Sequence, residues 1–329
     1  MAPSAGAINR ATIASTVGSC RTDGTAHPNS QSQQKTFTQI RHCRILCQQW
    51  IRLCVTRGTN MRISMNELTT YRWSFEEDVA AYCEAGISAI GVWRHKLSDF
   101  GDEKGIELIS DSGLEVSNLL WAGGFTGSDG RTYRESLFDG ADAIRLAGAM
   151  NCRCLVIYSG GRAGHTHSHA RRLFTGALQA LVPIAEEESV DLAIEPMHPA
   201  CAGNWTFLTS LDDTMQIIDD INHPHVKIAF DTYHLVDDED FLSRIEHIVP
   251  QIGIVHLGDG RAIPDDEQNR CRLGDGRVPL HDVVARLNYF GYDGWYDVEL
   301  MGEDVELDDY GELIEHARQA TEQMLTVPV

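Results

Sequence analysis

The sequence predicts an α/β protein folded as a closed (β/α)8 barrel, and three observations lead to this prediction. Eight strand-like runs alternate with helical patterns through residues 61–329. The last four of these strands end in glutamate, aspartate, histidine and glutamate, in that order along the chain. An open doubly wound sheet is the alternative, but it would normally place a glycine-rich phosphate loop after the first strand, and MNELTTYRWS contains no glycine.

The strand-like runs are short and mostly apolar, as expected of parallel strands that helices cover on both faces. The run VKIAF at 226–230 is typical, with a single lysine in five residues. Enough chain separates consecutive runs to form a helix. The predicted strands are residues 61–65, 87–93, 114–121, 153–158, 190–195, 226–231, 251–256 and 294–300.

The intervening segments carry apolar residues at helical spacing, and the alternation requires eight helices in all. The clearest start is at Ser74, because Glu77 follows three residues later and the two can form a capping box. Seven helical patterns can be assigned, at residues 74–85, 133–149, 170–189, 212–220, 238–248, 281–289 and 309–325.

The polar residues that end the last four strands are Glu195, Asp231, His256 and Glu299. A single aspartate after a strand is most often a helix cap or turn residue. Histidine and glutamate do not serve as such caps, so four consecutive endings need another explanation. The carboxyl ends of barrel strands meet at one face, where carboxylates and an imidazole form a ligand set for a divalent cation.

Residues 1–60 differ in composition from the rest of the chain. They hold seven of the 27 Lys and Arg residues but only one of the 48 Asp and Glu residues. We expect an N-terminal extension that is disordered or not part of the native protein, with the barrel domain at 61–329. An organelle transit or anchoring segment is an alternative, because 37–55 could form a basic helix. We favour Met61 as the true initiator, since a strand begins there directly.

Charge and cysteine content exclude several classes of protein. Residues 61–329 carry a net charge of −27, which would repel nucleic acid. The sequence has no apolar run of the ~18 residues needed to span a bilayer. Its nine cysteines include no pair of C-x-x-C motifs at zinc spacing. We therefore expect a cytoplasmic protein with free thiols and no nucleic-acid or membrane partner.

The residues around the four endings resemble a known family. IEP at Glu195, DTYH at Asp231, HLGD at His256, LGDG at 273–276 and DVEL at Glu299 are similar to motifs of the xylose isomerase-like TIM barrels. These include sugar isomerases, epimerases and inosose dehydratases, and the resemblance covers 61 to about 325.

The resemblance implies one divalent metal, commonly Mn²⁺ with Mg²⁺, Co²⁺ or Zn²⁺ as alternatives, bound by Glu195, Asp231, His256 and Glu299. It also implies that His234 contacts the substrate. Family epimerases have an arginine shortly after the metal-binding histidine. Arg261 lies at a slightly different offset, and Arg270 and Arg272 are alternatives.

This ligand set predicts a reaction through an enediolate. A metal that contacts the carbonyl and hydroxyl oxygens of a ketose stabilises the enediolate left when the neighbouring carbon loses a proton. Glu195 and Glu299 would remove and return that proton, which gives epimerisation or isomerisation. If a leaving group lies β to the carbonyl, the enediolate would expel it instead. The enzyme would then be a lyase, such as a dehydratase of a keto-inositol or an enzyme that cleaves an oxidised C-glycoside. The expected partner is a small sugar or polyol-derived ketone, and homo-oligomerisation stays open.

Four further features have both a functional and a structural interpretation. His198 could bind substrate or shape a turn between two prolines, and Arg94 at the end of the second strand suits a sugar. The glycines of LGDG could bind a phosphate or permit a turn. Glu67 follows the first strand and is expected to be solvated.

Apurinic endonucleases of the same superfamily need three zinc ions and affinity for a polyanion, which the charge of residues 61–329 disfavours.

Overall fold

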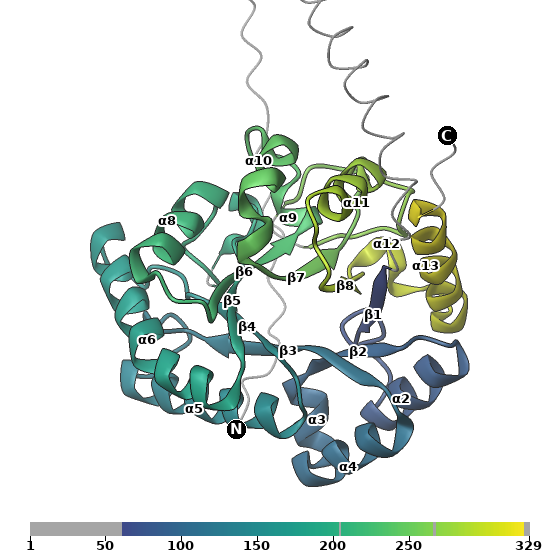
Figure 1. Cartoon of the computed structure of the whole chain (residues 1–329), viewed down its shortest axis with the longest axis horizontal. Coiled ribbons are helices and arrows are strands. Elements are labelled where there is room, and N and C mark those ends of the chain that lie inside the picture. The colour runs from purple at the N-terminus through teal and green to yellow at the C-terminus, as the bar shows by residue number, and fades with distance from the viewer. Residues whose placement is uncertain (1–60, 204, 266–267, 326–329) are drawn as a thin grey trace, which may run out of the picture. The chain divides into compact units, whose positions relative to one another are not determined.

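The computed structural model describes residues 61–203, 205–265 and 268–325. These residues form a closed barrel of eight parallel strands in chain order, in which β8 pairs with β1. Helices surround the barrel on its outside (Figure 1). The predicted (β/α)8 TIM barrel is therefore confirmed, whereas the expected extension at 1–60 lies outside the described residues.

All eight predicted strands are present; β6 has the predicted bounds, and the ends of the others differ from the prediction by two residues at most. They are β1 (Arg62–Asn66), β2 (Ala89–Trp93), β3 (Glu115–Gly123), β4 (Cys154–Tyr158), β5 (Asp191–Ile194), β6 (Val226–Asp231), β7 (Ile252–Leu257) and β8 (Trp295–Val298). β5 and β8 end one residue before Glu195 and Glu299. Both glutamates therefore belong to the loops at the carboxyl end of the barrel.

The predicted helices are present, and two of them begin elsewhere than expected. Ser74 caps α2 in a capping box with Glu77, as predicted. α6 begins at His167, capped by Thr166, and α10 begins at Phe241 instead of residue 238. The long helices are α2 (Phe75–Glu84), α5 (Tyr133–Ala149), α6 (His167–Glu188), α8 (Leu211–Ile221), α10 (Phe241–Ile248), α11 (Leu280–Tyr289) and α13 (Tyr310–Leu325).

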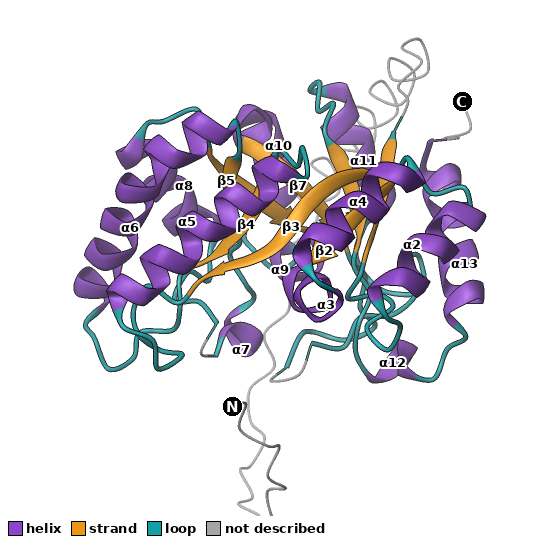
Figure 2. Ribbon diagram, turned by 90° about the horizontal axis from the view of Figure 1, so that it is seen from below, coloured by secondary structure: helices purple, strands orange, loops and turns teal. Residues whose placement is uncertain are grey.

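The segment between β2 and β3, to which we assigned no helical pattern, holds two helices, α3 (Arg94–Phe100) and α4 (Asp102–Ser112). Three short helices belong to the loops that follow β5, β6 and β8, namely α7 (Pro199–Ala202), α9 (Thr232–Leu235) and α12 (Glu303–Glu306). A 3-10 turn, η1 (Val249–Gln251), precedes β7. α7 and α12 lie together at one end of the barrel (Figure 2), which marks the carboxyl end of the strands.

Two apolar clusters stabilise the barrel. The larger one packs between the strands and the surrounding helices, and the smaller one fills the barrel interior with residues such as Val156, Ala193 and Ile254. Among the described residues, no helix is long and apolar enough to cross a membrane.

Candidate metal centre

Four acidic or imidazole side chains meet at the carboxyl end of the barrel. Glu195 directly follows β5, Asp231 ends β6, His256 lies in β7 and Glu299 directly follows β8. All four are buried, and one ligand atom from each lies within 4.8 Å of the other three. Asp231 and His256 are partners in the register of β6 and β7, so parallel pairing places them side by side.

The imidazole of His256 faces the three carboxylates. Its Nδ1 lies 2.9 Å from Glu195 Oε1, 3.0 Å from Glu299 Oε2 and 3.8 Å from Asp231 Oδ2. Burial lowers the pKa of His256, but its hydrogen bonds to the two glutamates outweigh burial and raise the pKa well above the ordinary value. One nitrogen and three carboxylates around a common point fit a divalent cation.

A buried arginine offsets part of the negative charge of the site. Arg270 lies 2.9 Å from Asp231 Oδ2 and 3.1 Å from Glu299 Oε1 through its guanidinium. Burial raises the pKa of Asp231, but the charges of Arg270, His234 and His256 together with the Arg270 hydrogen bond outweigh burial, and the pKa falls to about 2. Burial also raises the pKa of Glu299, but the charge of Arg270 together with the hydrogen bond and charge of His256 outweighs burial and lowers it. Burial instead dominates at Glu195 and raises its pKa. The two glutamates therefore differ in their tendency to hold a proton.

The loop that carries Arg270 is organised by Asp259. The carboxylate of Asp259 accepts backbone N–H groups from Gly274, Gly276 and Val278, each at 3.0 Å. Gly276 has to be glycine, because a Cβ there would lie 2.1 Å from Asp259 Oδ1. The LGDG glycines thus bind a carboxylate of the chain itself, which agrees with their interpretation as turn residues.

The structure separates the three candidate arginines. The N–H of Arg270 donates to the carbonyl of Met301 at 2.7 Å, which holds this part of the loop against the segment after β8. Arg261 is exposed and pairs with Asp304 at 2.9 Å. Arg272 pairs with an aspartate of the loop before α13, Asp308. Only Arg270, of these three, reaches the metal-ligand set.

His234 lies beside the four residues, in α9. Together with Glu195 and Glu299 it lines a cavity of about 210 Å³. Its Nε2 is 3.5 Å from the Arg270 guanidinium, and its Nδ1 is 3.4 Å from the sulfur of Cys201. Burial is the largest cause that lowers its pKa, to about 4. His234 is therefore a neutral imidazole at physiological pH.

The other two predicted substrate-binding residues lie farther out. His198 caps α7, because its Nδ1 accepts the N–H of Ala200 at 3.2 Å. Arg94 pairs with Asp139 at 2.9 Å and lines a separate cavity of about 450 Å³. That cavity shares Trp121 with the metal cavity, so Arg94 belongs to the surroundings of the site and not to its centre.

Glu67 is buried, and the expectation that it would be solvated is wrong. Glu67 directly follows β1, and its Oε2 accepts the backbone N–H of Trp93, at the end of β2, at 2.6 Å. Burial is the main cause that raises the pKa of Glu67 well above its ordinary value. No sequence pattern indicates this burial, because a glutamate after a strand is usually exposed.

Several residues of the metal cavity were not identified from the sequence. Its apolar and amide lining comes from loops after β5, β7 and β8 and includes Met197, Cys201, Trp205, Gln268 and Met301. Met301 could have been found, since it lies two residues after Glu299. The other four belong to loops without periodicity, so no pattern marks the direction of their side chains.

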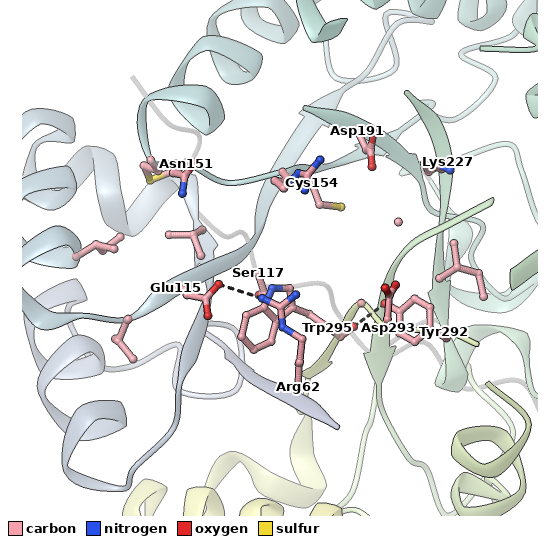
Figure 3. Close-up of a pocket in the computed structure, with 18 of the residues that line it drawn as sticks. Arg62, Glu115, Ser117, Asn151, Cys154, Asp191, Lys227, Tyr292, Asp293 and Trp295 are labelled. Atoms are coloured by element: carbon pink, nitrogen blue, oxygen red, sulfur yellow. Dashed lines mark hydrogen bonds and ion pairs between the residues drawn. The ribbon is translucent and has the colours of Figure 1, made fainter. Parts of the chain in front are cut away.

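A larger cavity, of about 860 Å³, lies at the opposite end of the barrel and is lined by residues at the start of strands (Figure 3). Arg62 there reaches Glu115 at 3.0 Å and stacks 4.0 Å above the ring of Trp295. The side chains of Arg62 and Glu115 are 43% and 63% exposed, so this pair is solvated. The cavity contains none of the four ligand residues.

The comparisons with known proteins agree with this architecture. The family model described as "Xylose isomerase-like TIM barrel" matches residues 79–322. A Streptomyces coelicolor protein named "Putative hydroxypyruvate isomerase" is 26% identical over 74% of this chain and 92% of its own length. A D-psicose 3-epimerase of Agrobacterium fabrum is 22% identical over 68% of this chain and 79% of its own.

Solved structures show the same fold. A crystal structure of IolI protein with a bound zinc atom superposes with a TM-score of 0.70 at 18% identity. The match covers 81% of this chain and 98% of that one. At this identity the likeness concerns the fold alone.

Proposed function

This chain belongs to the xylose isomerase-like TIM barrel family, and from that premise we propose that it is a divalent-metal-dependent isomerase or epimerase of a sugar or keto-sugar. Its relatives include proteins named as isomerases and epimerases. The observation that carries the proposal is the convergence of Glu195, Asp231, His256 and Glu299 within 4.8 Å of one another. A merely structural cluster would not bury three carboxylates so close together, because their mutual repulsion costs stability.

These four residues would hold the metal, for which we propose Mn²⁺, with Mg²⁺, Co²⁺ or Zn²⁺ as alternatives. When bound, the metal supplies Lewis-acid stabilisation of negative charge on the substrate oxygens. Asp231 is suited to permanent ligation, since its pKa of about 2 keeps it ionised. The barrel fixes the ligand positions, because all four side chains lie at or next to the ends of hydrogen-bonded strands.

Glu195 and Glu299 are proposed as the acid/base pair. They contact Nδ1 of His256 through Oε1 of Glu195 and Oε2 of Glu299. One glutamate would remove the carbon-bound proton as a general base, and the other would return a proton as a general acid. Return to the opposite face of the same carbon is epimerisation, and return to the adjacent carbon is isomerisation.

Arg270 and His234 are proposed to position the substrate. The guanidinium of Arg270 is within reach of Glu299, so it can also attract a substrate oxygen on which negative charge develops. Neutral His234 lines the cavity. It can donate a hydrogen bond to a substrate hydroxyl group or accept one from it. Arg261, His198 and Arg94 stay proposals for outer contacts with the substrate.

A hydrogen-exchange experiment tests the proposal. Metal-loaded protein is incubated with ketoses in deuterated water, and proton NMR follows the carbon next to the carbonyl. We expect deuterium at that carbon together with the isomeric sugar. The Glu299→Gln variant should lose the exchange, whereas Asp191→Asn at the opposite end of the barrel should retain it. Full activity of both Glu195→Gln and Glu299→Gln would overturn the proposal.

A lyase is the second candidate. After the same proton removal, a group bound β to the carbonyl would be expelled, as in dehydration of a keto-inositol or cleavage of an oxidised C-glycoside. A wide apolar cavity beside the metal centre favours this candidate, because a leaving group needs room. Accumulation of an unsaturated or cleaved product in the NMR experiment would identify the lyase.

We also propose a cytoplasmic location. The five cysteines of the described residues, Cys83, Cys152, Cys154, Cys201 and Cys271, are free thiols, as is usual in a reducing compartment. Whether subunits associate stays open.

A further inference from the structure

A second cavity lies beside the metal centre at the carboxyl end of the barrel. It has a volume of about 520 Å³, compared with about 210 Å³ for the cavity that contains Glu195 and Glu299. The two cavities share Trp121, Trp205, Gln268 and Met301, so they are continuous. We call the larger one the tryptophan cavity. A molecule at the metal centre would extend into it.

The tryptophan cavity has an aromatic wall whose rings come from four separate loops or strands. Its apolar lining residues are Leu68, Tyr71, Trp93, Trp121, Trp205 and Met301. The rings of Trp121 and Trp205 lie 5.5 Å apart with an interplanar angle of 54°. Trp205 is 45% exposed and Tyr71 is 39% exposed, although both are large and apolar. Exposed aromatic side chains gathered around one cavity mark a binding surface.

The charges around this cavity disfavour an anionic ligand. Its lining contains the carboxylates of Asp265, Glu303 and Glu306, and no lysine, arginine or histidine among the described residues. The neighbouring cavity contains Arg94 and Arg131, but Asp139 lies within 3 Å of both guanidinium groups. A phosphate in the tryptophan cavity would meet carboxylates without a free cation to balance it.

We propose that the substrate is a sugar-derived ketone that carries an uncharged aromatic ring, and that the ring occupies the tryptophan cavity. This inference rests on the proposed function, because that function places the ketone at the metal centre. A sugar ring fits the smaller cavity, whereas several hundred cubic ångströms of apolar space exceed what a simple ketose needs. Stacking on Trp205 and Trp121 recognises the flat face of the ring and requires no charge.

The test measures binding and does not depend on turnover. Isothermal titration calorimetry with the Mn²⁺-loaded full chain compares phenyl β-D-glucopyranoside, methyl β-D-glucopyranoside and glucose 6-phosphate. We expect the phenyl glycoside to bind at least about tenfold more tightly than the methyl glycoside, since it buries an additional ring. Glucose 6-phosphate should bind more weakly than either.

Two variants locate the effect. Trp205→Ala removes a half-exposed ring and should reduce the phenyl-to-methyl preference to about threefold or less. The matched control is Trp295→Leu, which removes a tryptophan from the cavity at the opposite end of the barrel and should keep the preference. Circular dichroism of both variants verifies that they fold.

Equal binding of the two glycosides, tighter binding of the phosphate or no measurable binding of the phenyl glycoside would each overturn the inference. Tighter binding of phenyltrimethylammonium than of the phenyl glycoside would overturn it as well, since the cavity would then select cations. Hydrogen exchange on small ketoses is measured separately. Exchange without ring preference leaves the proposed function intact and removes this inference. Ring preference without exchange removes the proposed function and, with it, the ketone substrate, and leaves only a cavity that binds an uncharged aromatic ring.

Discussion

The two ends of the barrel treat their charged residues in opposite ways. At the carboxyl end, Arg270 is 1% exposed and contacts Asp231 and Glu299, which are almost completely buried. At the amino end, Arg62 and Glu115 pair with each other while both stay largely in solvent. Asp191 likewise pairs with a partly exposed His225 at 2.7 Å.

This difference shows that the size of a cavity does not identify the functional end of the barrel. The amino end has the larger cavity, about 860 Å³, whereas the metal cavity has about 210 Å³. Exposed ion pairs there are stabilised by water and cost little to form. Buried charges cost several kcal/mol each to desolvate, so a cluster of them indicates a ligand or a reaction that needs it.

The largest expected effect is on catalysis. Glu195→Gln and Glu299→Gln should each lower kcat by about 10²–10⁴-fold, because each removes an acid/base group. Glu115→Gln at the amino end should leave kcat within about twofold of the unmodified protein, as expected for a solvated side chain. Steady-state assays on the ketose that shows exchange measure all three. Similar losses in all three variants would remove the contrast between the two ends.

The next effect is on stability. Arg270→Met should destabilise the metal-free protein by about 3–5 kcal/mol, since it leaves buried carboxylates without their counter-charge. Arg62→Met should cost less than about 1 kcal/mol, because its partner is solvated. Urea unfolding measures both free energies. Adding Mn²⁺ should restore part of the loss at Arg270 and none at Arg62, and the reverse pattern would contradict the proposed metal site.

Metal binding gives the third prediction. A divalent ion at 100 times its Kd should stabilise the folded protein by about 2.7 kcal/mol, because it binds only the folded form. Asp231→Asn should abolish most of this shift, and chelation by EDTA should have the same result in the unmodified protein. Asp191→Asn is the control, since this aspartate lies at the start of β5. Thermal unfolding with and without Mn²⁺ measures the shifts, which should stay unchanged in the control.

The smallest effect separates burial from location. Asp139 pairs with two arginines at the carboxyl end but stays 30% exposed. Burial raises its pKa, yet hydrogen bonds from Arg94 and Arg131 outweigh burial and lower it. Because the folded-state pKa lies below the unfolded value near 4, Asp139 stabilises the protein above that pH. This contribution is lost as the pH falls.

Unfolding free energies measured between pH 6 and pH 3 test this point. The unfolding free energy should fall less between pH 6 and pH 3 in Asp139→Asn than in the unmodified protein. The difference should be about 1 kcal/mol or less, because solvent screens this partly exposed pair. If this difference were as large as the destabilisation of Arg270→Met, then the location of an ion pair at this end of the barrel, and not its burial, would set its contribution to the unfolding free energy.

Much of the fold could be predicted from local patterns. Each apolar run such as VKIAF forms a strand because both faces of a parallel barrel strand are covered. The Ser74 and Glu77 capping box fixes the start of α2 from four residues of sequence. The helix start predicted at 238 is wrong, because Asp238 lies before α10 and its side chain accepts the N–H of Leu211 at 2.7 Å, a contact that sequence spacing does not show.

The four metal-ligand candidates could be identified from the sequence alone, because the barrel topology brings the carboxyl ends of all its strands to one face. Only the tertiary structure selected Arg270 among the candidate arginines, buried Glu67 and gathered the tryptophans into one cavity. Those outcomes depend on loops held by long-range contacts, such as the N–H of Arg270 to the carbonyl of Met301. Loops have no periodicity, so the direction of their side chains is set by the elements on which they pack.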